Sequence, residues 1–261
     1  MGTLQPFITA RKQLGRKNKS VKLALSVLRR ILNLSIRLWR DENGLTWLDI
    51  VPLIQLLPLT DARRPYPLSW SEQHALFQIL ADHPSRMCLF KVNTRCRDQE
   101  VCQLKWEWEI PVPELDTSVF LISGELIKNR EDKLIVLNRI AKSVVDSVRG
   151  QHKDYVFTYQ SKPIERINNN GWKRARRQLN LPVRVHDLKH TFGRQLRAAS
   201  VPLETHKILL GHRNGDTTSH YFAPELEELI EAENRVCAGN SGKTPAKLRQ
   251  NSGIGCLETK R

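Results

Sequence analysis

Apolar residues recur at helical spacing after residue 20 and predict a basic amphipathic helix. Ser20 is a residue type that caps helix N-termini. The apolar face holds Val21, Leu25, Leu28, Leu32 and Trp39, and the opposite face holds Lys22, Arg29, Arg30, Arg37 and Arg40. A basic face is either a solvated surface over a core or a surface that lies along phosphates, and the pattern leaves both open.

Residues 57–68 interrupt this pattern with three prolines and no periodicity, which predicts a linker. Directly after it, Ser69 and Glu72 have the spacing of a capping box and predict a helix that ends at about Ala81. A second helix is expected over residues 98–105. The larger folded part of the chain therefore begins after the linker.

The period of the apolar residues changes to two after residue 103. Leu104, Trp106 and Trp108 alternate with charged residues, and two short β-rich runs follow at 118–122 and 133–137. These three segments predict a small antiparallel sheet. Helical patterns then return at 172–179, 186–199, 203–210 and 224–235. The expected fold class is mainly α with a small antiparallel β-sheet, that is, α+β.

Three parts of the chain follow from these patterns. Residues 1–60 predict a helical domain, and residues 61–237 predict a larger mixed domain. Residues 238–261 are rich in Gly, Ser and Lys, and they predict a flexible basic tail.

The charge of the chain points to a polyanion as its partner. Forty-two Lys and Arg against 27 Asp and Glu give a formal net charge of +15, and nucleic acid is the partner such a charge favours.

The most apolar stretch, residues 48–59, contains an Asp, a Gln and two prolines and does not resemble a membrane span. Lys and Arg appear early in the N-terminal segment, so we expect no signal peptide and a cytoplasmic protein. The five cysteines show neither CxxC spacing nor a disulfide framework.

Three separated segments carry polar residues that core packing does not require. They are NTRCRDQEV at 93–101, HDLKHTF at 186–192 and LLGHRNGDTTSHY at 209–221. Each is weak alone, since a single His and Lys pair on one helix face is common on protein surfaces. In this order, with an arginine early and a tyrosine late, they form a specific combination.

The combination resembles the conserved boxes of the tyrosine recombinase, or phage integrase, family, and the similarity covers about residues 17–235. The family's T-G-x-R-x-x-E box matches residues 94–100 and carries the first catalytic arginine onto Arg97. The family lysine in a β-hairpin matches Lys128. The H-x-x-R box matches His186, with Lys189 in place of the usual arginine. His212 follows Leu-Gly as in the family, and Tyr221 has the spacing of the nucleophile.

The resemblance implies site-specific DNA integration and recombination by phosphodiester strand exchange through a 3′-phosphotyrosyl intermediate. It also implies that residues 1–60 are a partial helical core-binding domain, which binds DNA, and that residues 61–237 are the catalytic domain. Phosphoryl transfer needs a nucleophile, a proton donor for the leaving oxygen and positive groups around the phosphate. The expected roles are nucleophile for Tyr221, base for His186, acid for Lys128, and phosphate contacts for Arg97, Lys189 and His212. Glu100, one helical turn from Arg97, would orient the guanidinium. No metal or nucleotide cofactor is required, because cationic side chains stabilise the charge and the phosphotyrosyl bond retains the energy for religation.

The implied partners are double-stranded DNA attachment sites, with a homo-tetramer assembled on DNA, and no membrane. An alternative is a truncated or degenerate recombinase that binds DNA without strand transfer. Arg95 stands where the family has glycine, Lys189 replaces an arginine, and the segment before the linker is short. A second alternative is a zinc-binding helix that uses His186 and His190 as ligands, although the sequence has no third ligand at the spacing of a known zinc motif.

Overall fold

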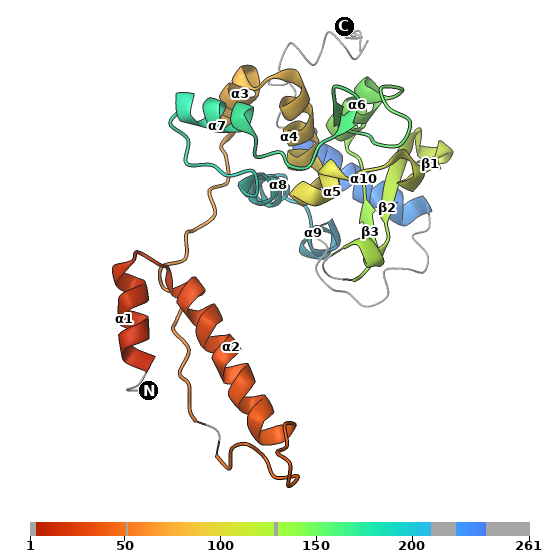
Figure 1. Cartoon of the computed structure of the whole chain (residues 1–261). Coiled ribbons are helices and arrows are strands. Elements are labelled where there is room, and N and C mark those ends of the chain that lie inside the picture. The colour runs from red at the N-terminus through yellow and green to blue at the C-terminus, as the bar shows by residue number, and fades with distance from the viewer. Residues whose placement is uncertain (1–3, 51, 128–129, 210–222, 239–261) are drawn as a thin grey trace, which may run out of the picture. The chain divides into compact units, whose positions relative to one another are not determined.

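The computed structural model describes residues 4–50, 52–127, 130–209 and 223–238 of the chain. The chain forms two compact units, Met1–Arg64 and Pro65–Arg261, and each is described by itself (Figure 1). The division falls inside the proline-containing segment 57–68. Helices dominate, and the two small sheets are antiparallel, which confirms the predicted α+β class. The assignment of residues 1–60 to a core-binding domain and of residues 61–237 to a catalytic domain stays a prediction. The predicted flexible tail lies outside the described residues from residue 239 onward.

Two helices of the N-terminal unit, α1 (Gln5–Gln13) and α2 (Asn18–Arg37), pack through a small apolar cluster. The buried members of that cluster are Ile8, Val21, Leu25 and Ile54. The prediction that Ser20 caps α2 was wrong, because Ser20 lies inside the helix. The carboxylate of Asp61 accepts a 2.6 Å hydrogen bond from the first backbone N–H of α2 instead. The unpaired N–H groups and the positive end of the helix dipole favour a carboxylate there.

The larger unit surrounds α4, a helix that is buried along most of its length. α4 packs against α6 and α8, and together they bury the main apolar cluster of the chain. The sequence patterns did not reveal α4, because a helix that is covered on all sides lacks an amphipathic period. The helices of this unit are α3 (Trp70–Ile79), α4 (Asp82–Thr94), α5 (Asp98–Cys102), α6 (Arg139–Val148), α7 (Asn170–Gln178), α8 (Asp187–Ala198), α9 (Leu203–Leu209) and α10 (Ala223–Ala238).

The capping box predicted for α3 is present. The Ser69 side chain accepts from the backbone of Glu72, and the Glu72 carboxylate accepts from the backbone of Ser69. In contrast, α5 is shorter than the predicted helix over 98–105 and ends at Cys102. The backbone of residues 104–106 bonds to that of residues 154–156, which removes those residues from the helix.

The three-stranded antiparallel sheet is confirmed, with the order β1-β2-β3. Its first strand begins later than the alternating residues 104–108 predicted, because Trp106–Trp108 form a 3₁₀ turn. Register is fixed by pairs such as Phe120 opposite Ile135, both buried in the main cluster. The strands are β1 (Glu109–Val112), β2 (Thr117–Ile122) and β3 (Lys133–Ile135), and a separate hairpin holds β4 (Thr158–Tyr159) and β5 (Lys162–Pro163).

The C-terminal helices confirm the predicted return to helical structure. α8 and α10 contact each other through a second apolar cluster that contains Phe192, Leu196, Ala232 and Val236. α8 is also tied to the segment before α3, since the Thr191 hydroxyl accepts a 3.0 Å hydrogen bond from the backbone N–H of Leu68. None of the described helices has the length and apolar content that crossing a membrane requires.

Candidate active site

Arg97 lies in a tight turn between two helices. α4 ends at Thr94, the next residue, Arg95, has φ 55° in the left-handed region, and α5 begins at Asp98. Glu100 holds Arg97 at two points: its carboxylate accepts from the backbone N–H at 2.7 Å and from the guanidinium at 2.9 Å. The contact expected between Arg97 and Glu100 is therefore present. It fixes both the backbone and the guanidinium of the predicted first catalytic arginine.

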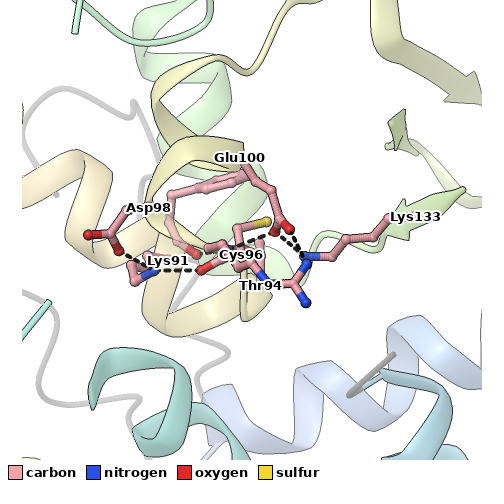
Figure 2. Close-up of polar contacts among 8 residues, drawn as sticks. Lys91, Thr94, Cys96, Asp98, Glu100 and Lys133 are labelled. Atoms are coloured by element: carbon pink, nitrogen blue, oxygen red, sulfur yellow. Dashed lines mark hydrogen bonds and ion pairs between the residues drawn. The ribbon is translucent and has the colours of Figure 1, made fainter. Parts of the chain in front are cut away.

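The same carboxylate receives a third donor from the sheet. The Lys133 ammonium, at the start of β3, forms an ion pair and hydrogen bond with Glu100 (Figure 2). Burial alone would raise the pKa of Glu100. The Lys133 charge and the hydrogen bonds from Lys133 and Arg97 outweigh burial and lower it. Glu100 is thus an ionised, buried carboxylate that joins α5 to β3.

A third polar contact lies beneath the turn. The Lys91 side chain is fully buried in α4 and donates to the carbonyl of Cys96 at 2.7 Å. Its ammonium also lies 2.7 Å from a carboxylate oxygen of Asp98 (Figure 2). The residues on both sides of Arg97 therefore contact one buried cation.

α8 brings the second predicted box to the site. His186 directly precedes the helix, and the Asp187 carboxylate accepts a 2.9 Å hydrogen bond from the backbone N–H of Arg184, which fixes the first turn. Burial, and then the charges of Lys91, His190 and Lys189, lower the pKa of His186. A lowered pKa keeps the imidazole neutral near pH 7, as the role of a base requires.

Lys189 is a half-buried cation among other cations. Burial, and then the charges of Arg95, Arg97 and Lys133, lower its pKa to about 8. Burial and the charge of Arg97 likewise lower the pKa of Arg95 to about 10. Within the described residues, neither Lys189 nor Arg95 forms a hydrogen bond or ion pair through its side chain. The charges of three neighbouring cations thus act on Lys189, and the carboxylate of Glu100 partly offsets them.

Three of the six predicted catalytic residues are described, and three are not. Arg97, His186 and Lys189 lie in the turn before α5 and at the start of α8, two segments that both pack on α4. Lys128, His212 and Tyr221 lie outside the described residues. Their roles stay predictions, as do those of the other three.

The sequence reasoning missed two lysines. In the sequence, Lys133 is only the first residue of a β-rich run, and its contact with Glu100 joins residues 33 apart. Lys91 stands between Phe90 and Val92, so a lone charge within an apolar run was the available signal. A lysine in such a position is fully buried only if it finds partners.

The structure also bears on the zinc alternative. The rings of His186 and His190 lie 5.3 Å apart between their centroids. Across the described ranges, no group of three or more His, Cys, Asp or Glu residues is arranged to hold a metal ion. These two histidines are therefore neighbours without a third ligand among the described residues.

Residues 71–228 match the sequence profile of the phage integrase family. Among curated proteins, the integrase/recombinase y4qK of Sinorhizobium fredii (strain NGR234) is 28% identical over 250 residues, which are 92% of this chain and 72% of that protein. The integrase of Salmonella phage P22 is 24% identical, and the match covers 81% of this chain and 56% of the phage protein.

Solved structures show the same fold. The Tn1549 transposon integrase in complex with transposon right end DNA matches with a TM-score of 0.61 and 16% identity, over 87% of this chain and 83% of that one. The XerH site-specific recombinase bound to palindromic difH substrate matches with a TM-score of 0.53 and 17% identity, over 76% of this chain and 60% of that one. Because the family profile matches more than half of its length, the chain belongs to the phage integrase family of tyrosine-type site-specific recombinases.

Proposed function

We propose that this chain recombines DNA at specific sites by phosphodiester strand exchange through a 3′-phosphotyrosyl intermediate on Tyr221. The observation that carries the proposal is the convergence of half-buried cations on one place. Burial, and then the charges of Arg95, Arg97 and Lys133, lower the pKa of Lys189, while burial and the charge of Arg97 lower the pKa of Arg95. The carboxylate of Glu100 partly offsets both effects. Such a site lacks negative charge, and a bound phosphate would supply it.

The chemistry assigns one task to each predicted residue. The Tyr221 oxygen attacks the scissile phosphorus, and His186 takes the phenolic proton. The bond from phosphorus to the 5′ oxygen breaks, and Lys128 gives a proton to the leaving 5′ oxygen, which departs as a hydroxyl. Arg97, Lys189 and His212 stabilise the charge on the non-bridging oxygens. Attack by a 5′ hydroxyl of another strand reverses the steps and restores Tyr221, so the exchange needs no external energy source.

Double-stranded DNA is the proposed partner. The chain carries a formal charge of +15, and solved structures that it resembles are complexes with difH substrate and with transposon right end DNA. A tetramer of this chain on DNA would bring two duplexes and four tyrosines together. Size measurement of the protein–DNA complex by analytical ultracentrifugation tests that part of the proposal.

The decisive experiment identifies the DNA sequence that the protein acts on and detects the covalent protein–DNA bond in the same assay. A pool of nicked duplexes with a random segment is incubated with the protein, and DNA that stays attached in SDS is recovered and sequenced. We expect an enriched sequence and a protein–DNA adduct. Tyr221→Phe should bind the enriched duplex with unchanged affinity and form no adduct, because it lacks only the nucleophilic oxygen. Tyr159→Phe, at the exposed end of a hairpin strand, is the matched control and should form the adduct normally.

The same experiment separates the proposal from DNA binding without strand transfer. One observation favours that alternative: Arg95 adopts a left-handed conformation that costs a side-chain-bearing residue about 1–2 kcal/mol. Sequence-specific binding without any SDS-resistant adduct would support the alternative. Adduct formation by Tyr221→Phe would contradict the assignment of the nucleophile and leave strand transfer intact.

A further inference from the structure

Lys91 is a charged side chain in α4, a helix of which ten residues are buried. It lies on α4 between residues of the main apolar cluster, and its exposed fraction is 0%. Placing an ammonium group in such surroundings is costly even when it is paired. An apolar side chain of similar volume would fill this space with less penalty. The position of Lys91 therefore calls for a role that an apolar residue could not perform.

The partners of Lys91 indicate what that role is. Its ammonium contacts the Cys96 carbonyl at 2.7 Å and the Asp98 carboxylate at 2.7 Å. These residues are the two sequence neighbours of Arg97, so the lysine holds the backbone carbonyl before Arg97 and the side chain of the residue after it. Figure 2 shows both contacts of Lys91. Glu100 holds the other end of Arg97, the guanidinium, at 2.9 Å.

The turn needs such a restraint because local structure alone does not stabilise it. Arg95 is left-handed with φ 55°, and α5 is only five residues long. A helix of that length gains little stability from its own hydrogen bonds. The contacts of Lys91 attach this short segment to α4, which the core fixes from several sides.

We propose that Lys91, with Asp98, is a positioning residue that holds Arg97 in the geometry that contacts the phosphate. The inference rests on the proposed function, since it assumes that Arg97 binds a phosphate. Lys91 itself is covered by the protein and does not touch the DNA. Its contribution is a preorganised turn, so that the guanidinium needs no rearrangement when the phosphate arrives.

The test reads phosphate binding at Arg97 itself, with inorganic phosphate as the probe. In the ¹⁵N-labelled full chain at low salt, the side-chain Nε–Hε signal of Arg97 is identified by its loss in Arg97→Lys. Titration with phosphate then gives an affinity at that residue. The variants are Lys91→Met, which removes the ammonium and keeps the chain length, and Asp98→Asn, which removes the charge at a partly exposed side chain. Lys142→Met is the control, since it removes a 2.6 Å lysine–aspartate pair on the surface of α6.

We expect both Lys91→Met and Asp98→Asn to weaken phosphate binding at Arg97 on the order of 10-fold, the scale of a small misplacement. Lys142→Met should leave it unchanged. The other arginine signals and the melting temperature report whether each variant is folded. If Lys91→Met does not fold, Asp98→Asn tests the inference by itself. Wild-type affinity in the folded variants would overturn the inference and leave the proposed function standing. If the Arg97 signal of the wild-type chain does not shift on addition of phosphate, the proposed site is overturned, and this inference with it.

Discussion

The charge of Lys189 determines how well the proposed site can stabilise a phosphate above neutral pH. Its pKa of about 8 means that the free protein begins to lose this charge just above neutral pH. Arginine at this position would stay charged and offer two parallel hydrogen bonds to a phosphate. The departure from the family pattern therefore has a measurable signature in the pH dependence.

Cleavage measured at low DNA concentration should decline as the pH rises through about 8. The sign follows from the lysine, since deprotonation removes a positive charge that the transition state needs. Lys189→Arg should move this decline to higher pH and preserve or raise the rate. Lys189→Ala should reduce cleavage on the order of 10² to 10³-fold and change DNA binding little. An alkaline decline that is identical in all three proteins would contradict the assignment of Lys189.

Arg95 combines two unfavourable features, a left-handed backbone and a partly buried charge next to Arg97. Arg95→Gly should therefore raise the free energy of unfolding by about 1 kcal/mol. Ser200→Gly is the control, because Ser200 has a similar φ of 54° and no charge. Urea denaturation of both variants separates the backbone contribution from charge repulsion. A lower stability in Arg95→Gly would show that the Arg95 side chain contributes to the fold.

At the scale of elements, the site depends on the connection between β3 and α5. Lys133 and Glu100 come from these two elements, and their ion pair bridges them. The sheet thereby acts on Arg97 indirectly, through the carboxylate that orients the guanidinium. A substitution that displaces Lys133 should therefore also disturb the guanidinium of Arg97, through Glu100.

Lys133→Met should lower the cleavage rate and shift its acid limb to higher pH. The pKa of Glu100 is lowered, with Lys133 as the largest lowering cause. Ionised Glu100 stabilises the arrangement around Arg97. This stabilisation is present above the unfolded pKa of Glu100 and is lost as the pH falls through its folded pKa. Without Lys133 that loss occurs at a higher pH. Lys105→Met, which removes the exposed pair with Glu107, is the control and should leave the acid limb unchanged. An unshifted acid limb in Lys133→Met would contradict the link.

At the scale of the whole molecule, the basic charge should govern DNA affinity. The logarithm of the binding constant should fall linearly with the logarithm of salt, with a slope of about −0.9 for each phosphate neutralised. Removal of the N-terminal unit, residues 1–64, takes away twelve Lys and Arg against four Asp and Glu. We expect weaker binding and a shallower slope, measured by fluorescence anisotropy. Unchanged affinity would show that this unit does not contact DNA, and circular dichroism checks that the remainder is folded.

Local chemistry explains which parts of the site were predictable. The pair of Arg97 and Glu100 is separated by one helical turn, so its contact follows from sequence spacing alone. The capping box at Ser69 is equally local and was predicted correctly. Lys91 and Lys133 could not be predicted in the same way. The contacts of Lys91 require the turn that ends α4, and those of Lys133 join two elements.

The sequence by itself determined the fold class, the small antiparallel sheet, the order of the boxes and the excess of positive charge, because each depends on periodicity, spacing or composition. The tertiary structure decided where α4 runs, since a helix buried on all sides leaves no period to read. It also decided that Trp106–Trp108 form a turn rather than a strand, because the backbone N–H of Trp108 bonds back to the carbonyl of Lys105. The charge state of Lys189 was likewise a tertiary property. Its pKa depends on burial and on cations that only the fold brings together.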